Sequence, residues 1–210
     1  MPTVISVFHQ RYPGIEIDLQ MGNSEQILRL ILDREVDLGI AGPIKKSESL
    51  SSVFIHREKL LFVCSPRNPL ASKKSVSIGE LGRIPFIWRE RGTQTLALVK
   101  QWFQENAADD FPLQALSLAN MEAAKRIVEE GYGVTIIPEI AARREIEACL
   151  LQRLPVKGFD LTVDYCLFFL KARIFSRAAE AFLATLCDIR QFSHGENLRN
   201  LPRNGGRVSS

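Results

Sequence analysis

The spacing of apolar and polar positions is clearest between residues 118 and 138. Apolar side chains recur at helical spacing after Asn120, whose side-chain oxygen can cap a helix start. Gly131 and Gly133 allow the positive φ values that end a helix, and an apolar, β-branched run then stops at Pro138. The pattern predicts a helix, a glycine turn and a buried strand. A dinucleotide-binding loop has the reverse order, strand before helix, so we assign these glycines a structural role.

The chain before this stretch shows a helix followed by a strand–helix–strand pattern. Residues 15–21 alternate apolar and polar side chains, as a strand with one face toward a core does. Asn23 and Gln26 have the spacing of a capping box at a helix start. Because two strands joined by a crossover helix form a right-handed parallel unit, we expect one here. The predicted elements are a helix at 2–11, a strand at 15–21, a helix to about residue 34, a strand at 36–41 and extended runs at 53–55 and 60–64.

A second group of elements of the same kind follows residue 69. Ser77 and Glu80 form another capping-box pattern, and strands alternate with helices as they do in a parallel sheet. The run at 162–170 is the most β-prone of the chain, and Ser176 is a good cap for a last helix. The further predicted elements are strands at 85–89, 114–118 and 150–154, and helices at 95–106, 139–149 and 176–191.

These elements predict an α/β fold with two Rossmann-like subdomains. Breaks near residues 65–69 and 156–162 are expected to form a double hinge, with the last helix returning to cover the first unit. Two open sheets joined in this way place a cleft at the carboxyl ends of their strands, where ligands bind. The predicted boundaries are 1–66 plus 163–192 for subdomain I, 67–162 for subdomain II and 193–210 for a disordered tail.

Composition limits the protein class but identifies no partner. The chain has 210 residues, of which 46% are hydrophobic and 24% charged, and a chain of this kind needs neither disulfides nor metal to fold. Its widely spaced cysteines are expected to be reduced and mostly buried thiols of a cytosolic protein. The sequence shows no apolar run of the ~20 residues that a membrane helix needs and no secretion signal. A net charge of +3 is too small to argue for nucleic acid.

Loops at the predicted strand ends carry the candidate binding chemistry. Several of them lead into helices, so backbone amides and positive helix ends would converge and favour a carboxylate or an inorganic oxyanion. The best single candidate is the loop in which Gly92 allows close approach and Thr93 and Thr95 flank a helix start. Arg89 or Arg91 could add a charge-assisted hydrogen bond. The alternative is that both threonines only cap their helix.

Catalysis is the weaker prediction. The chain has no G-x-S-x-G elbow and no phosphate-binding loop, and His9, His56 and His194 lack metal-ligand spacing. Its acidic residues are spread over predicted helix faces and turns, which is typical of solvated surface. We therefore expect a binding protein without cofactor or metal, and not an enzyme.

Five short motifs occur in the order and spacing of a known family. Together they resemble the effector-binding domain of LysR-type transcriptional regulators over residues 1 to about 191. The resemblance implies a fold like that of type II periplasmic solute-binding proteins, with an inducer in the cleft and dimers or tetramers formed through this domain. The motifs are Tyr12-Pro13-Gly14, Asp37-Leu38, Pro69-Leu70, Gly131-Tyr132-Gly133 and Pro138.

The resemblance also implies a ligand site. Residues 89–96 are similar to the REPGSGTR loop of a subgroup that senses small anions or carboxylated metabolites. Arg91, Gln94 and Leu96 depart from that loop, so the ligand of the subgroup is not carried over. By family position Asn23, Ser24, Thr93, Thr95, Asn120 and Met121 would line the pocket, and with Arg89 and Gly92 they form the predicted ligand-binding set.

The family normally carries a winged helix-turn-helix before this domain, and the 210 residues do not include one. The family's first regulatory strand and its pocket loop also precede the first helix and are not included. The resemblance therefore implies the sensing part of a cytoplasmic regulator that binds DNA only through the other module. The alternative is a stand-alone solute-binding protein of a transport system, against which the cysteines and the lack of a signal peptide argue.

Overall fold

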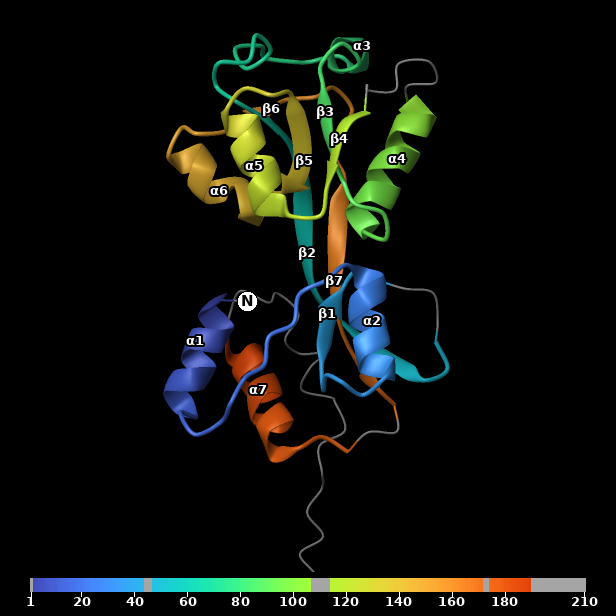
Figure 1. Cartoon of the computed structure of the whole chain (residues 1–210), viewed down its shortest axis with the longest axis vertical. Helices are drawn as coiled ribbons and strands as arrows, with labels where there is room; N and C mark the ends of the chain where they lie inside the picture. The colour runs from blue at the N-terminus through green and yellow to red at the C-terminus, as the bar shows by residue number, and fades with distance from the viewer. Residues whose placement is uncertain (1, 44–46, 107–113, 172–173, 190–210) are drawn as a thin grey trace, which may run out of the picture. The chain divides into compact units, whose positions relative to one another are not determined.

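The computed structural model describes residues 2–43, 47–106, 114–171 and 174–189 (Figure 1). They divide into two compact units, Met1–His56 with Asp164–Ser210 and Arg57–Val163, which we call unit 1 and unit 2. The predicted tail at 193–210 lies outside the described residues. None of the described helices is long and apolar enough to cross a membrane.

Two long strands pass through both units. β2 (Leu50–Cys64) and β7 (Thr162–Leu170) are neighbours in the strand order β1-β7-β2-β5-β3-β4. The two separate extended runs predicted at 53–55 and 60–64 are therefore one continuous strand. The boundary between the units falls within β2, after His56, whereas the sequence predicts a break after that strand, at residues 65–69. The polar residues that separate the two apolar runs continue the strand and do not form a turn.

Unit 1 is built around β7, which is buried on both faces. Leu167 and Phe169 belong to one apolar cluster, and Cys166 and Phe168 belong to a second. Successive side chains of a strand point to opposite faces, so a strand covered on both sides reads as a continuous apolar run. The other elements of unit 1 are α1 (Pro2–Arg11), α2 (Ser24–Leu32), β1 (Gly39–Ala41) and α7 (Arg177–Asp188).

Helices α1 and α7 cover one face of β7 and α2 covers the other. Phe8 of α1 meets Phe182 of α7 with ring centroids 5.3 Å apart, and Arg11 bonds Asp188 at 2.6 Å. The last helix packs on the first unit as the sequence predicts, although it ends at residue 188 and not near 191. On the other side Ile31 of α2 lies fully buried in the second cluster.

The prediction of a strand at 15–21 is wrong. The segment is irregular, and no backbone hydrogen bond pairs it with a strand in the described part of the chain. Leu19 is 59% exposed and Met21 91% exposed, so the alternating pattern does not face a packed core. The predicted parallel pairing in this unit is absent for the same reason, and the strand predicted at 36–41 is shortened to Gly39–Ala41.

Unit 2 contains the parallel sheet that the sequence predicts. β3 lies between β5 and β4 and runs parallel to both, while β2 pairs antiparallel with β5. Apolar residues of α5 and α6 cover one face, and an aromatic cluster that includes Trp102 and Phe103 of α4 covers the other (Figure 1). The elements are α3 (Ile78–Leu81), β3 (Phe86–Arg89), α4 (Gln94–Asn106), β4 (Gln114–Leu118), α5 (Met121–Glu129), β5 (Val134–Pro138), α6 (Glu139–Glu147) and β6 (Gln152–Leu154).

The local start and stop signals act as predicted. Both capping boxes form, Asn23 with Gln26 and Ser77 with Glu80. Gly131 and Gly133 have φ values of 94° and 78°, in the left-handed region that favours glycine. The helix–glycine turn–strand prediction is thus confirmed, and both glycines have the structural role assigned to them.

We expect Gly133→Ala to destabilise the protein much more than Gly131→Ala. A Cβ atom at residue 133 would lie 2.0 Å from the Pro85 carbonyl oxygen, whereas one at residue 131 would meet no atom within 4 Å. Positive φ alone costs about 1–2 kcal/mol in either variant. Urea unfolding should therefore show a loss above about 2 kcal/mol only for Gly133→Ala. Equal losses would contradict the close approach to Pro85.

Candidate functional site

The candidate site in unit 2 lies where neighbouring parallel strands end. Arg89, the last residue of β3, is in register with Leu118, the last residue of β4. The loops that follow these strands lead directly into α4 and α5. Because carboxyl ends of parallel strands share one sheet edge, the N-termini of both helices point to the same edge. β5 is parallel to β3 and leads into α6, so a third helix begins at this edge.

The loop before α4 is held in shape by its own residues. Gly92 has a φ of 83°, which favours glycine. The Thr93 hydroxyl donates to the Glu90 carbonyl at 3.1 Å and accepts from the Leu96 amide at 3.3 Å. Thr93 thus caps α4, as the alternative interpretation of this loop predicts for it, and its hydroxyl oxygen is already used in hydrogen bonds.

The next two residues of α4 have unused polar atoms. Gln94 Oε1 is buried and has no hydrogen-bond partner among the residues that the structure describes. The Thr95 side chain is half-buried, and its hydroxyl has no bond within the same part of the chain. A buried carbonyl oxygen without a donor is costly, so Gln94 is a position at which a bound molecule would lower the free energy. In the sequence, Gln94 is marked only as a departure from the family's loop.

Asn120 and Met121 begin the neighbouring helix. The Asn120 side-chain oxygen accepts from the Glu122 amide at 2.9 Å and from the Ala123 amide at 3.1 Å. Met121 is half-buried and packs against the apolar cluster that α5 covers. The cap therefore uses the oxygen of Asn120 and leaves its exposed amide nitrogen as the group that could contact a ligand.

The third helix N-terminus at this edge already holds a carboxylate. Glu58 is 8% exposed, and its Oε1 accepts a hydrogen bond of 3.1 Å from the Ile140 amide in the first turn of α6. A helix N-terminus attracts negative charge through its free amides and its dipole. Glu58 lies far from α6 along the chain and carries no local motif, so the sequence alone does not reveal this contact.

A buried lysine joins α5 to α6. Lys125 is 5% exposed; its ammonium group bonds Glu145 at 2.5 Å and the Ala141 carbonyl at 3.1 Å, and lies 3.0 Å from Glu122. Burial acts to lower the pKa of Lys125, but hydrogen bonds to both glutamates raise the pKa above its usual value. Burial acts to raise the pKa of Glu145, and the Lys125 ammonium outweighs it and lowers that pKa. The pair therefore stays charged around neutral pH and fixes the two helices together.

Asn23 and Ser24 belong to unit 1 and not to this edge. Asn23 caps α2: its oxygen accepts from the Gln26 amide at 3.0 Å, and Gln26 Oε1 accepts from the Asn23 amide at 2.8 Å. Ser24 is the half-buried first residue of α2. The structure brings the other predicted residues together at the β3–β4 edge of unit 2: Arg89, Gly92, Thr93, Thr95, Asn120 and Met121.

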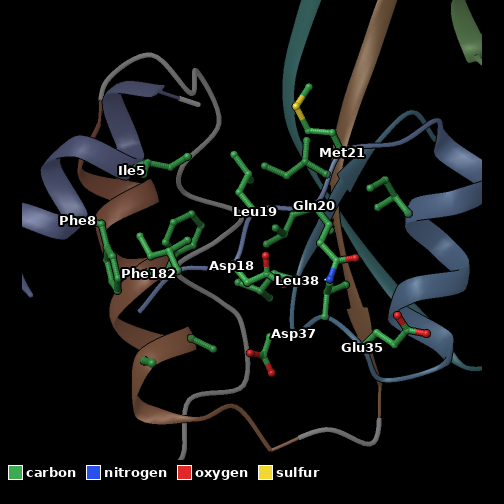
Figure 2. Close-up of a pocket in the computed structure, with 18 of the residues that line it drawn as sticks. Ile5, Phe8, Asp18, Leu19, Gln20, Met21, Glu35, Asp37, Leu38 and Phe182 are labelled. Atoms are coloured by element: carbon green, nitrogen blue, oxygen red, sulfur yellow. Dashed lines mark hydrogen bonds between the residues drawn. The ribbon is translucent and has the colours of Figure 1, made fainter. Parts of the chain in front are cut away.

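Unit 1 contains a groove of about 710 Å³ that the sequence analysis did not predict (Figure 2). None of the predicted ligand-binding residues lines it. Its walls are mostly apolar side chains of α1, α7 and the irregular segment 15–22, together with residues of and next to β1. The signal that could have revealed it is the alternating pattern of 15–21, if its lack of a partner strand had been recognised.

The described residues hold no cluster of three or more histidine, cysteine, aspartate or glutamate side chains able to bind a metal ion. The cysteines are free, and burial raises the pKa of the Cys64 thiol to about 11. Cys166 is also buried, Cys187 is half-buried and Cys149 is exposed. The thiols are thus less uniformly buried than the sequence suggested.

Comparison with known proteins gives consistent matches. The family model of the LysR substrate binding domain matches residues 1–188. The HTH-type transcriptional activator CmpR of Synechocystis sp. is 30% identical over 93% of this chain and 62% of its own length. The RuBisCO operon transcriptional regulator of Allochromatium vinosum is 25% identical over 86% of this chain and 59% of its own length. The chain thus spans about 60% of these curated relatives.

Solved structures agree on the fold. The regulatory domain of CcmR from Synechocystis PCC6803, in complex with 2-PG, has a TM-score of 0.77 and 26% identity, over 88% of each chain. The effector binding domain of QuiR in complex with shikimate has a TM-score of 0.75 and 18% identity, over 93% of this chain and 90% of its own. The second likeness, at that identity, shows the fold alone.

We expect Lys125→Met to lower the free energy of unfolding by about 3 kcal/mol, because it leaves the Glu145 carboxylate buried without its partner. The matched double variant Lys125→Met/Glu145→Leu removes both charges and should recover a large part of that loss. Urea unfolding at pH 7 measures the free energy of unfolding of both variants and of the unchanged protein. A single variant no less stable than the double would contradict the proposed link between α5 and α6.

The two threonines of the α4 loop should differ in their effect on stability. Thr93→Val removes the cap and should cost about 1 kcal/mol. Thr95→Val keeps the side-chain shape and removes a hydroxyl without a protein partner, so the change should stay within about 0.5 kcal/mol. Thermal unfolding of the two variants in buffer without added anions makes the comparison. Equal losses would mean that Thr95 also caps the helix.

Proposed function

Since this chain belongs to the LysR substrate-binding domain family, we propose that it is the effector-sensing part of a cytoplasmic, bacterial transcription regulator. The curated relatives that it matches are HTH-type or RuBisCO operon regulators, and family and relatives alike describe regulators and not enzymes. In this proposal DNA is bound by a winged helix-turn-helix outside the 210 residues. The protein acts as a homodimer or tetramer and associates with no membrane.

The proposed effector is a small anion held at the β3–β4 edge. The register of Arg89 with Leu118 is the observation that supports this site most directly, because it sets the N-termini of α4 and α5 side by side. The Glu58 carboxylate already occupies the start of α6, so the effector is proposed to bind at the starts of α4 and α5 only. Arg89 supplies a positive charge at the strand end, and anions bound by guanidinium and helix amides together are well stabilised.

Each predicted residue has a role in the proposal. Gly92 lets the effector approach the backbone, Thr93 keeps the loop in shape, and Thr95 offers a hydroxyl. Asn120 and Met121 supply an amide group and an apolar wall from α5. Asn23 and Ser24 offer the same kind of chemistry, a capped helix start, at α2 of unit 1. These roles follow the chemistry of each side chain and the helix that it begins.

The effector chemistry can be narrowed further. The CcmR regulatory domain, which is 26% identical to this chain, is in complex with 2-phosphoglycolate (2-PG). This likeness supports a small anion of similar size as effector. The buried Gln94 oxygen, which accepts no hydrogen bond from the described residues, favours an effector that also carries a donor, such as a hydroxyl group.

Regulation follows from differential binding. An effector that prefers one arrangement of the two units over another shifts the population toward that arrangement, and a dimer can pass the shift to DNA-binding modules. A complete switch needs a preference of about ten-thousandfold, or about 5.5 kcal/mol, and a smaller preference suffices for partial regulation. The alternative of a transport solute-binding protein has no supporting observation, because the curated relatives are regulators.

The site predicts a specific response to anions. 2-Phosphoglycolate, titrated into the 210-residue protein, should raise its melting temperature, with about 2.7 kcal/mol of stabilisation at a hundred times the Kd. Arg89→Gln should weaken binding by about 1.5–3 kcal/mol, since it removes a charge-assisted hydrogen bond. Isothermal titration calorimetry of both proteins, with sulfate and uncharged glycerol as further ligands, measures the difference.

Arg91→Gln is the matched control for this experiment. Arg91 lies two positions further along the same loop and is exposed, whereas Arg89 is half-buried at the strand end. The control variant should bind anions about as well as the unchanged protein. If no anion stabilises the protein, or if Arg91→Gln weakens binding as much as Arg89→Gln, the proposed site is wrong.

A further inference from the structure

A pocket of about 450 Å³ lies in unit 2, at the opposite end of the sheet from the candidate anion site. It is lined by Glu80 and by three short segments, 68–70 after β2, 83–85 before β3 and 131–133 before β5. β3 and β5 begin side by side, since Phe86 is in register with Val134 (Figure 1). The volume is in the range of pockets that hold small molecules.

The segments that line this pocket are fixed by hydrogen bonds of the protein itself. Asn68 Oδ1 accepts from the Leu70 amide at 2.9 Å, which closes a turn after β2. The Val134 amide donates to the Pro85 carbonyl at 3.0 Å and ties the glycine turn at 131–133 to the start of β3. A ligand that enters a pocket formed in advance loses little free energy to ordering its walls.

The side-chain acceptors of the pocket are already engaged. The Glu80 carboxylate pairs with Lys73 and accepts from the Ser77 amide and the Ser77 hydroxyl, each at 2.8 Å. Hydrogen bonds from Lys73 and Ser77 lower the pKa of Glu80 to about 2, so this carboxylate is ionised at neutral pH and the Lys73 ammonium balances its charge. Because Asn68 Oδ1 is also in use, a ligand rich in donors gains little here.

Two side-chain donors of the pocket are not engaged. Arg83 is exposed and makes no hydrogen bond or ion pair with any residue that the structure describes. The Tyr132 hydroxyl has no partner in the same part of the chain. A guanidinium group presents a fork of donors that matches the two oxygens of a carboxylate. The pocket therefore favours a ligand that accepts hydrogen bonds and carries a negative charge.

The other lining side chains are apolar. Pro69, Ile84 and Pro85 line the pocket together with Tyr132, which is 49% exposed. The Tyr132 ring contacts no other aromatic ring among the described residues. Aromatic pairs are more stable than their buried area alone would make them, so an exposed ring without a partner favours a ligand that brings one.

We propose that this pocket binds a small aromatic carboxylate, with the carboxylate on the Arg83 guanidinium and the ring on Tyr132. The observation that carries the proposal is the difference between engaged acceptors and unengaged donors next to apolar walls. Inorganic phosphate would leave the apolar walls without contacts, and an uncharged aromatic molecule would leave the guanidinium without a partner. The inference does not rest on the anion site of unit 2, with which this pocket shares no residue.

The test is a titration of the 210-residue protein with 3-phenylpropanoate, followed by NMR of the backbone amides. The amide signals of Leu70 and of 131–133 should shift and saturate at millimolar ligand, while those of 92–95 stay unchanged. The matched ligand 3-phenylpropanamide has the same ring without the charge and should bind about threefold to tenfold more weakly. Butanoate, which has the charge without the ring, should also bind more weakly.

Two pairs of variants separate the roles of charge and ring. Arg83→Gln should weaken 3-phenylpropanoate binding by about threefold to tenfold and leave binding of the amide unchanged. Its control, Arg153→Gln, removes an exposed arginine of β6 that does not line the pocket and should bind as the unchanged protein does. Tyr132→Ala should weaken the binding of both ligands by about fivefold, whereas Tyr132→Phe keeps the ring and should change little.

Three results would overturn the proposal. The first is that 3-phenylpropanoate shifts the amides of 92–95 or 39–41 and not those of 131–133. The second is equal affinity for the carboxylate and the amide. The third is an equal loss in Arg83→Gln and Arg153→Gln, which would indicate general attraction to a positive surface. Arg89→Gln keeps the two sites apart, because it should weaken 2-phosphoglycolate binding and leave 3-phenylpropanoate binding unchanged.

Discussion

Backbone pairing on both sides of a parallel strand is the constraint on which this molecule depends. β3 has such pairing, with β5 on one side and β4 on the other, and the resulting register places helix starts at one sheet edge. β1 of unit 1 has β7 on one side only among the described strands. The same α/β chemistry therefore gives a parallel strand paired on both sides in unit 2, with helix starts at one sheet edge, and a short edge strand beside a groove in unit 1.

Local signals in the sequence were sufficient wherever the relevant partner is a few residues away. The capping boxes at Asn23 and Ser77 and the positive φ of Gly133 need only neighbouring backbone, and all were predicted. The absence of a strand at 15–21 was not predictable from local signals. An alternating pattern shows which side chains share a face, but it does not show whether a strand is available to pair with. The prediction of two separate strands in place of β2 was wrong for a related reason: pairing with other strands continues β2 through the polar residues at its centre.

The position of the candidate site could be predicted from the sequence, but the hydrogen bonds of its side chains could not. Helix starts after strands can be read from the sequence, and six of the predicted residues do meet at the β3–β4 edge: Arg89, Gly92, Thr93, Thr95, Asn120 and Met121. How each oxygen is used cannot be read there. Thr93 and Asn120 use theirs as helix caps, while Gln94, which matches no pattern, has a buried oxygen without a partner in the described chain. Glu58 reaches α6 only through the fold.

The two units differ in how firmly the surrounding structure holds the residues of their candidate sites in place. In unit 2 the helix starts are fixed before any ligand arrives, by caps, by the buried Lys125–Glu145 pair and by aromatic packing on the other face of the sheet. Anion binding at a pre-organised edge loses little free energy to ordering. In unit 1 the groove is lined by the irregular segment 15–22, which no described strand pairs, and by residues of and next to β1. Asn23 and Ser24 lie at the start of α2 in unit 1, so the geometry of the β3–β4 edge does not depend on them.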